Sequence, residues 1–277
     1  MTLDLLTVVY APELELLRTQ ARSMALRFQE IDRIWVMVND EDSLADRISL
    51  GWWEQHSHKV KIVRRSDLGY LPGPGISGWE SQQVMKLLGC ALSESDWCVV
   101  LDSKTWFVRD YEQADFFSEN RARCRIYPTP EVFARGQRYV ESILGTPGSS
   151  YISPGGVPNF IKPSNARGLI NVIELETKRK FPDWFESHCH LDQEGVTEFA
   201  CHSAYVHGLG YDRFYTGEQT FTVSNLADWQ VKDFDQWYQE LLRPTTWTAS
   251  IQERAKPHLT AEQKHTWNDY LRDKGLA

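Results

Sequence analysis

Apolar runs of strand length alternate with amphipathic segments along the first hundred residues of the chain. Residues 3–10, 34–38, 60–63 and 97–101 are rich in valine, isoleucine and leucine, and each run is short enough to be a buried strand. Residues 14–28 and 77–92 instead carry apolar side chains at helical spacing. Strands that alternate with helices predict an α/β fold with a mostly parallel sheet and right-handed connections.

The helix predicted over residues 77–92 has an unusual polar face. At about 100° per residue, Trp79, Gln82, Gln83 and Lys86 fall on one side, opposite a continuous apolar stripe. A solvated face usually favours glutamate and lysine, whereas this face carries an aromatic ring, two neutral amides and one cation. We therefore consider it a candidate wall of a binding site.

The buried strand after this helix ends in Asp102, Ser103 and Lys104, which place a carboxylate and a cation at its carboxyl end. Ligands of open α/β sheets bind outside the carboxyl ends of the strands. We therefore expect the polar helix face and this strand end to line one crevice. Asp40, in the acidic cluster after the second strand, either holds a ribose or base there or only caps the next helix.

The second half of the chain is less regular. Residues 197–207 are predicted to form a helix, with Thr197 as its N-cap and Glu198 in its first turn. Residues 226–277 are polar and rich in tryptophan and lysine, which suggests two or more amphipathic helices. We expect a main domain over residues 1–225 and a C-terminal helical extension over residues 226–277 that packs on it.

Composition narrows the class of protein. A net charge of −8 and a pI of about 5.5 argue against nucleic acid as the main partner, because phosphate binding needs a basic surface. Five cysteines without framework spacing suggest reduced thiols, and no apolar leader or membrane-spanning run is visible. These features favour a cytoplasmic protein. The glycine-rich fingerprints of dinucleotide-binding folds and P-loops are absent from the sequence.

A group of histidines and cysteines allows two interpretations. His188, Cys189 and His190, together with Cys201 and His202, are residue types that ligate metals. Their spacing fits no structural zinc pattern, so a mixture of buried cysteines and surface histidines is favoured.

The element Asp102-Ser103-Lys104 allows three interpretations. Many nucleotide-sugar transferases carry Asp-x-Asp at the end of a comparable strand, where carboxylate oxygens hold Mn²⁺ or Mg²⁺ against the diphosphate. Lys104 stands in the place of the second aspartate; it cannot ligate a metal, but it can neutralise phosphate charge itself. The other two interpretations are a phosphatase-like aspartate nucleophile and a plain Asp–Lys pair at the strand end.

Several short motifs in the first 110 residues resemble a bacterial family of uncharacterised, glycosyltransferase-like proteins. These motifs lie at residues 7–10, 15–17, 20–23, 39–40, 78–87 and 101–104. Members of the family look like GT-A nucleotide-diphospho-sugar transferases. The resemblance implies a GT-A-like, Rossmann-like fold that binds a nucleotide-sugar donor across the carboxyl edge of the sheet. The resemblance itself supplies no substrate. The function that we expect is transfer of the sugar to a hydroxyl acceptor such as a glycan, as in bacterial surface polysaccharide synthesis.

On this resemblance, each candidate residue has an expected role. Val9, Tyr10 and Asp40 would hold the nucleoside. The rest of the donor would contact Trp79, Gln82, Gln83, Lys86 and Ser103. Asp102 would orient the donor sugar or hold Mn²⁺ or Mg²⁺. Lys104 would offset the charge of the leaving group and could make the metal unnecessary. Glu198 would be the general base of an inverting transfer.

The competing hypothesis is a catalytically inactive transferase fold that binds a nucleotide or a glycan. The missing second aspartate is its main support. An oxidoreductase on a related sheet is disfavoured because the phosphate-binding glycines are missing.

Overall fold

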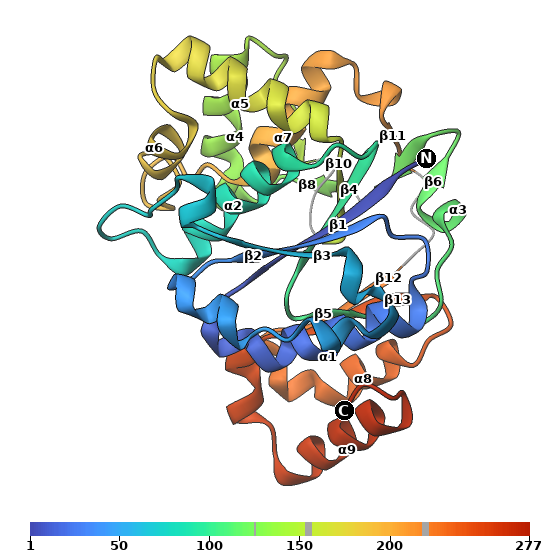
Figure 1. Cartoon of the computed structure of the whole chain (residues 1–277). Coiled ribbons are helices and arrows are strands. Elements are labelled where there is room, and N and C mark those ends of the chain that lie inside the picture. Colours follow the sequence, from blue (N-terminus) through green and yellow to red (C-terminus); the bar gives the residue numbers. More distant parts are fainter. Residues whose placement is uncertain (125, 153–156, 218–221) are drawn as a thin grey trace.

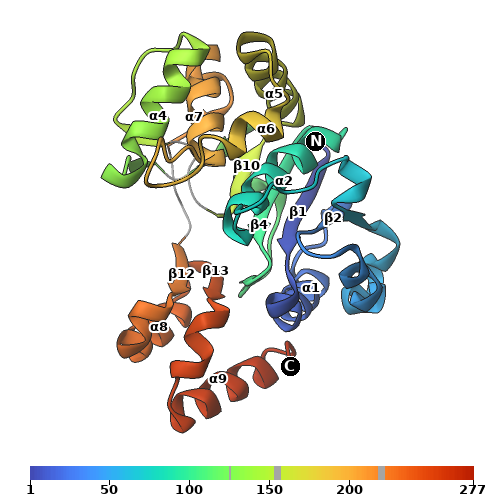
Figure 2. The same cartoon turned by 90° about the vertical axis from the view of Figure 1, so that its left-hand side faces the viewer.

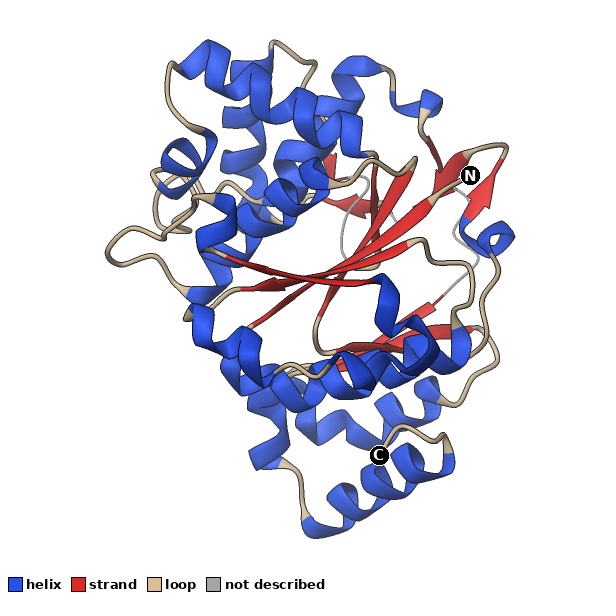
Figure 3. Cartoon of the chain, viewed as in Figure 1, coloured by secondary structure: helices blue, strands red, loops and turns tan. Residues whose placement is uncertain are grey.

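Four parallel strands form the centre of the molecule, as the apolar runs predict. The computed structural model describes residues 1–277 except 125, 153–156 and 218–221. Strands β1 (Leu3–Val9), β2 (Arg33–Val38), β3 (Val60–Arg64) and β4 (Trp97–Asp102) are parallel, and β10 (Asn159–Ile161) adds an antiparallel strand beside β4. Helices cover both faces of this sheet (Figure 1 and Figure 3), so the expected α/β fold with a mostly parallel sheet is confirmed.

The other elements surround this sheet. The helices are α1 (Leu14–Arg27), α2 (Gly78–Leu92), α3 (Gln113–Phe116), α4 (Glu131–Leu144), α5 (Pro163–Thr177), α6 (Phe181–Glu186), α7 (Glu198–Leu209), α8 (Phe234–Leu241) and α9 (Ala261–Asp273). The remaining strands are β5 (Thr105–Phe107), β6 (Phe117–Ser118), β7 (Arg121–Arg123), β8 (Tyr127–Pro128), β9 (Tyr151–Ile152), β11 (Tyr215–Thr216), β12 (Thr222–Leu226) and β13 (Thr246–Ile251).

The strand order of the central sheet reverses between β1 and β4. The order across the sheet is β10-β4-β1-β2-β3, so the chain leaves β1 toward β2 and β3 and then returns to place β4 on the other side of β1. In sheets of this kind, the crevice outside the carboxyl ends of the two strands at the reversal is the usual ligand site. Tyr10 follows β1 and Asp102 ends β4, so both lie at this point.

Side chains of the sheet alternate between two apolar cores. Leu5 and Val9 of β1 belong to the core that contains the apolar side of α1, whereas Leu6 and Val8 belong to the core that contains the apolar side of α2. Successive side chains of a strand point to opposite faces, and both faces are covered here. This double burial explains why the strands are continuous apolar runs in the sequence.

The connection between β2 and β3 differs from the alternating pattern that the sequence predicts. It consists of two 3₁₀ helices, η2 (Asp42–Arg47) and η3 (Leu50–Lys59), in place of an α-helix. Within η3, Glu54 has a positive φ of 45°, which interrupts regular helical geometry. The parallel pairing of β2 with β3 is nevertheless preserved.

The C-terminal segment contains a strand that the sequence analysis did not predict, in addition to helices. β13 pairs in parallel with β12 and antiparallel with β5, which ties the segment to the main part of the chain. A third apolar core joins α8 and α9 to Trp106 of β5, whose ring centroid lies 4.8 Å from that of Trp267. Figure 2 shows this part below the helices α4, α5 and α7. The division of the chain near residue 226 stays a prediction.

Length and hydropathy of the helices within the described residues bear on whether the chain can cross a membrane. None of the helices there is both long enough and apolar enough to cross a bilayer.

Candidate active site

A cavity of about 790 Å³ opens at the carboxyl ends of β1 and β4. Ligand sites for small molecules usually measure roughly 300–1,000 Å³. The edge of the sheet contributes Tyr10, Glu13, Asp102 and Lys104. The helices α2 and α7 with their N-caps contribute Gly78, Trp79, Gln82, Lys86, Thr197, Glu198 and Phe199. A third, largely apolar group around β8, β9 and α4 contributes Pro128, Pro130, Phe133 and Ile152. The fourth group, which we name the C-terminal wall, consists of Trp229, Gln252, Glu253 and Arg254.

Two helices begin at this cavity. Ser77 caps α2: its hydroxyl accepts from the Glu80 amide at 3.2 Å, while the Glu80 carboxylate accepts from the Ser77 amide at 2.7 Å. Thr197 caps α7, and its hydroxyl accepts from the Ala200 amide at 3.1 Å. The first turns of both helices line the cavity, so their partial positive charge favours an anion there.

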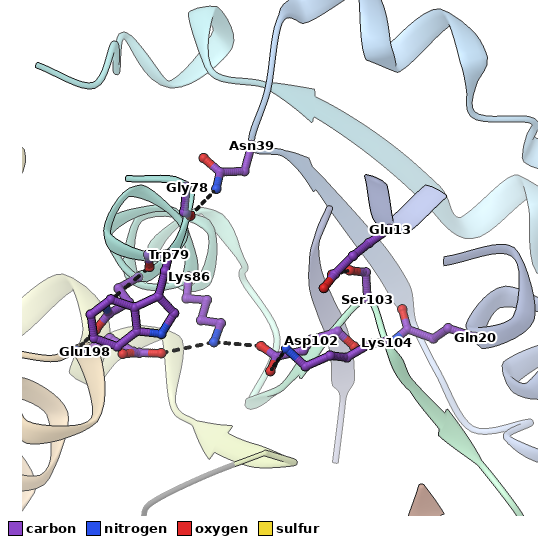
Figure 4. A network of polar contacts seen from close by, with 11 residues as sticks. Glu13, Gln20, Asn39, Gly78, Trp79, Lys86, Asp102, Ser103, Lys104 and Glu198 are labelled. Carbon is purple, nitrogen blue, oxygen red and sulfur yellow. Dashed lines mark hydrogen bonds and ion pairs between the residues drawn. The ribbon is translucent and has the colours of Figure 1, made fainter. Parts of the chain in front are cut away.

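Four charged side chains of alternating sign line the cavity and lie in a row (Figure 4). We name this row the charge ladder. The ammonium of Lys86 lies 3.0 Å from Glu198 Oε1 and 2.9 Å from Asp102 Oδ1. Lys104 Nζ lies 3.4 Å from Asp102 Oδ2. The ladder therefore runs Glu198, Lys86, Asp102, Lys104, and it joins α7, α2 and the end of β4.

Burial and ion pairing act in opposite directions on these groups. Burial alone would lower the pKa of Lys86, but the carboxylates of Asp102 and Glu198 outweigh it and raise that pKa well above its usual range. Burial alone would raise the pKa of Asp102, but the ammonium groups of Lys86 and Lys104 outweigh it and lower that pKa far below its usual range. Both groups are therefore charged throughout the pH range in which proteins are active.

The contacts of Lys86 and Lys104 determine whether the oxygens of Asp102 are available to ligate a divalent cation. Mn²⁺ and Mg²⁺ need several oxygen ligands around one position. Each oxygen of Asp102 is instead in contact with an ammonium group, and Lys104 occupies the place where an Asp-x-Asp element would supply its second carboxylate. The residues at this strand end therefore do not fit a divalent cation.

Hydrogen bonds from α1 hold the turn that carries Ser103 and Lys104. Gln20 is fully buried, and its Nε2 donates to the backbone carbonyls of Asp102 and Thr105, both at 2.7 Å. A buried amide with two backbone partners fixes the backbone of this turn. The position of Lys104 is therefore set by a helix that lies early in the sequence.

Glu13 is a carboxyl group at the cavity that was not singled out from the sequence. Its side chain accepts a hydrogen bond from the Ser103 hydroxyl and another from Tyr10. Burial raises the pKa of Glu13, although the nearby Lys104 ammonium and the Ser103 hydroxyl oppose the shift. Burial and the Glu13 carboxylate raise the pKa of Tyr10 to about 12, so that hydroxyl keeps its proton and donates it.

Seven of the predicted site residues meet at the cavity, and four do not. Those that line it are Tyr10, Trp79, Gln82, Lys86, Asp102, Lys104 and Glu198. The described lining does not include Val9, Asp40, Gln83 or Ser103. For the seven, the shared location agrees with the expectation of one crevice, while their individual roles stay predictions.

The four other residues support the site from behind. Val9 lies in the core, and the Asp40 carboxylate accepts from the Ala11 amide at 2.9 Å, which fixes the chain after β1. Gln83 is buried, and its Oε1 accepts from the Glu198 amide at 3.2 Å. Ser103 is fully buried and donates to Glu13. Packing between distant segments thus keeps these four side chains out of the described lining, and their expected roles stay predictions.

The histidine and cysteine group is largely dispersed. Cys201 and His202 are fully buried in α7, and His188 stacks on Tyr139 with ring centroids 4.8 Å apart. Cys189 and His190 do approach Glu80, with His190 Nδ1 2.7 Å from Glu80 Oε1 and all three potential ligand atoms within 4.8 Å of one another. That Glu80 carboxylate also belongs to the capping box of α2, so its contacts serve the helix start.

Glu13 and the residues of the C-terminal wall line the cavity but were not predicted from the sequence to belong to the site. Trp229 is 70% exposed, and Arg254 Nε lies 3.8 Å from Asp228 Oδ2. The richness in tryptophan of residues 226–277 was the available signal for the wall. For Glu13, the signal was its position three residues after the apolar run of β1.

Comparisons with known proteins assign a family and show distant structural similarity. The sequence model of one family matches residues 13–275, and the chain belongs to that family, which is described as a family of unknown function (DUF6492). No curated protein matches the chain by sequence. Among solved structures, the chain is similar to apo mouse xyloside xylosyltransferase 1, with 11% identity, a TM-score of 0.46, and coverage of 90% of this chain and 97% of that chain.

The chain is also similar to two structures of LgtC. One is the galactosyltransferase LgtC in complex with donor and acceptor sugar analogues, with 12% identity, a TM-score of 0.48, and coverage of 90% of this chain and 86% of that chain. The other is an active-site mutant of LgtC, with 14% identity, a TM-score of 0.47 and the same two coverages.

The first prediction concerns the buried cation of the charge ladder. Lys86→Met removes the ammonium that compensates two carboxylates, and we expect the free energy of unfolding to fall by about 3–5 kcal/mol. Lys104→Met is the matched control: its side chain is 19% exposed, so water partly replaces the lost ion pair, and the fall should be smaller than for Lys86→Met. Urea denaturation at neutral pH measures both. Equal effects of the two substitutions would contradict the assigned importance of Lys86.

The second prediction concerns Glu13 and pH. Because burial raises the pKa of this carboxyl in the folded state, wild-type stability should fall as pH rises from the ordinary value of 4.5 through the raised pKa. Glu13→Gln lacks this titration, so it should be more stable than wild type at neutral pH and equal to it at pH values well below 4.5. Thermal unfolding between about pH 3 and 8 tests this, with Glu15→Gln, an exposed carboxyl two residues further along the chain, as the matched control. A Glu13→Gln variant that is less stable at neutral pH would refute the assignment.

Proposed function

We propose that the chain is a glycosyltransferase that moves a sugar from a nucleotide-sugar donor to a hydroxyl acceptor. The observation that carries the proposal is the cavity at the strand-order reversal, where the charge ladder lies beside two helix N-termini. This combination suits a ligand that has both an anionic part and hydroxyl groups. The resemblance of residues 7–104 to bacterial glycosyltransferase-like proteins supports the same reaction, with an acceptor in surface polysaccharide synthesis.

The donor diphosphate would lie against the first turns of α2 and α7. Backbone amides and the partial positive charge of a helix start both favour phosphate oxygens. Lys104 adds a full charge, and its side chain remains partly exposed, unlike that of Lys86. Lys86 pairs with two carboxylates, so in this proposal it organises the ladder and leaves the phosphate contact to Lys104.

The proposed reaction exchanges one bond at the anomeric carbon of the donor sugar. The bond from that carbon to the phosphate oxygen breaks, its electron pair leaves with the nucleoside diphosphate, and the acceptor oxygen forms the new bond. Lys104 offsets the negative charge that develops on the leaving group. The proton of the acceptor hydroxyl goes to a carboxylate, for which Glu198 is our candidate; its Oε1 pairs with Lys86, so Oε2 would take the proton.

Lysine in place of a metal is part of the same proposal. In a metal-dependent enzyme of this type, carboxylates would hold a divalent cation at the end of β4 to offset the diphosphate charge. The contacts of Asp102 with Lys86 and Lys104 leave no such ligand set, and Lys104 already supplies positive charge at this strand end. We therefore propose a metal-independent transfer.

The third prediction tests donor binding. Incubation with UDP-, GDP-, CMP- and dTDP-sugars should raise the melting temperature with at least one nucleotide, because a ligand that binds only the folded state stabilises it. The same donor should be hydrolysed or transferred when varied hydroxyl acceptors are added. Binding without turnover would favour the alternative, a catalytically inactive binding module. The absence of any shift would contradict both.

The fourth prediction tests the role of Lys104. Transfer should survive EDTA, and Lys104→Ala should lower kcat by about 10²–10³-fold, the usual effect of losing one group that stabilises transition-state charge. Lys61→Ala, an exposed lysine on β3, is the matched control and should retain wild-type kcat. Complete loss of activity in EDTA with rescue by Mn²⁺ would refute metal independence. Unchanged turnover of Lys104→Ala would refute the role of this side chain.

A further inference from the structure

Two different sheets direct the carboxyl ends of parallel strands toward the same cavity. In the central sheet these strands are β1 and β4. In the small sheet, β12 and β13 are parallel, with Leu226 opposite Ile251 at their last pair. The chain then enters the 3₁₀ helices η6 (Asp228–Asp233) and η7 (Glu253–His258), whose first residues belong to the C-terminal wall. The strand-end geometry that places ligands in α/β sheets is thus repeated by the C-terminal segment.

Trp229 is an exposed indole within this wall. Its relative exposure of 70% contrasts with that of Trp237 (4%) and Trp267 (6%), which pack in the third core of the same segment. A single exposed apolar side chain is ordinary on a protein surface, but Trp229 also lines the cavity, where a ligand can cover its indole. The broad apolar face of an indole suits the apolar face of a flat or ring-shaped ligand.

Charge distinguishes the C-terminal wall from the opposite side of the cavity. Around the wall, Arg254 lies beside Asp228, and Lys256 Nζ lies 2.7 Å from Glu253 Oε2, so two cations balance two anions. On the opposite side the two cations of the charge ladder likewise balance two carboxylates, but the starts of α2 and α7 lie there in addition and favour anions. A diphosphate therefore fits the opposite side, and an uncharged ligand with many hydroxyl groups fits the C-terminal wall.

We propose that the C-terminal wall is the acceptor subsite of the enzyme and that the acceptor is a sugar. The apolar face of the acceptor sugar stacks on Trp229, and its hydroxyl groups bond to the side chains of Gln252 and Arg254. This subsite directs an acceptor hydroxyl toward the charge ladder, where the donor is bound. The inference rests on the proposed glycosyltransferase function and adds to it the class of acceptor and the segment that recognises it.

The test compares Trp229→Ala with Trp229→Phe in the full-length protein. The donor is the nucleotide sugar with the largest thermal shift. The acceptor probes are methyl glycosides of glucose, galactose, N-acetylglucosamine and rhamnose, with glycerol and a serine-containing peptide as non-sugar acceptors. Trp229→Ala should raise the KM for the best glycoside by about tenfold or more, and Trp229→Phe, which keeps a stacking ring, by no more than about threefold. Donor Kd and donor hydrolysis without acceptor should stay within about twofold of wild type.

Leu175→Ala is the matched control, because Leu175 is 62% exposed on α5 and does not line the cavity. It should change neither KM nor kcat. Unfolding curves of all variants should coincide, since Trp229 buries little surface in the folded chain.

Each other outcome identifies what has failed. An unchanged acceptor KM in Trp229→Ala, or transfer to glycerol or the peptide in preference to every glycoside, overturns the acceptor subsite while donor turnover still supports the transferase. A weakened donor Kd with an unchanged acceptor KM would show that the indole stacks on the nucleobase, which also overturns it. A wild type that hydrolyses donor but transfers to no probe refutes a sugar acceptor. A wild type that binds no nucleotide sugar refutes the proposed function itself.

Discussion

Burial of the Lys86 ammonium is the constraint on which the cavity depends. A fully buried cation is stable only when carboxylates lie close enough to offset its lost hydration. Asp102 and Glu198 meet this requirement, and they come from the end of β4 and the start of α7. Because Lys86 itself lies on α2, one ammonium group fixes three elements relative to one another. The ion pairs of Lys86 therefore hold together the elements that line the cavity, in addition to the apolar packing around them.

The same constraint assigns different chemistry to side chains of one type. Asp102, between two ammonium groups, is held ionised, whereas burial favours the neutral form of Glu13 on the far side of Lys104. Lys86 is enclosed by carboxylates, while Lys104 keeps part of its side chain accessible. The surroundings of the two lysines thus give them different roles. Lys86 is a structural cation, whereas Lys104 can contact a ligand. The contacts of Asp102 with two ammonium groups are therefore the basis of the proposed metal-independent transfer.

The sequence predicted the elements better than the contacts between them. β1 to β4, α2 and α7 follow from local periodicity, and helical indexing correctly placed Trp79, Gln82 and Lys86 on one side of α2. Gln83 faces α7 as Lys86 does, but its side-chain oxygen accepts from the Glu198 amide and it is not in the described lining, a contact that indexing of one helix cannot predict. The pairing of Lys86 with Glu198 spans 112 residues, and β13 pairs with β5 across 143 residues at Ala249 and Trp106, so neither was visible in a local window.

The two sides of the cavity rest on different cores. The charge ladder belongs to elements of the central sheet and its helices, whereas the C-terminal wall follows strands whose core contains Trp106, Trp237 and Trp267. β5, which directly follows Asp102 and Lys104 in the chain, contributes to both: Phe107 lies in a core of the central sheet and Trp106 in the third core. Substitutions in the C-terminal wall can therefore alter which ligand is recognised without disturbing the ion pairs of the ladder. The charge ladder and the C-terminal wall thus have separate supports. Under the proposed function, this separation would allow one fold to serve several acceptors.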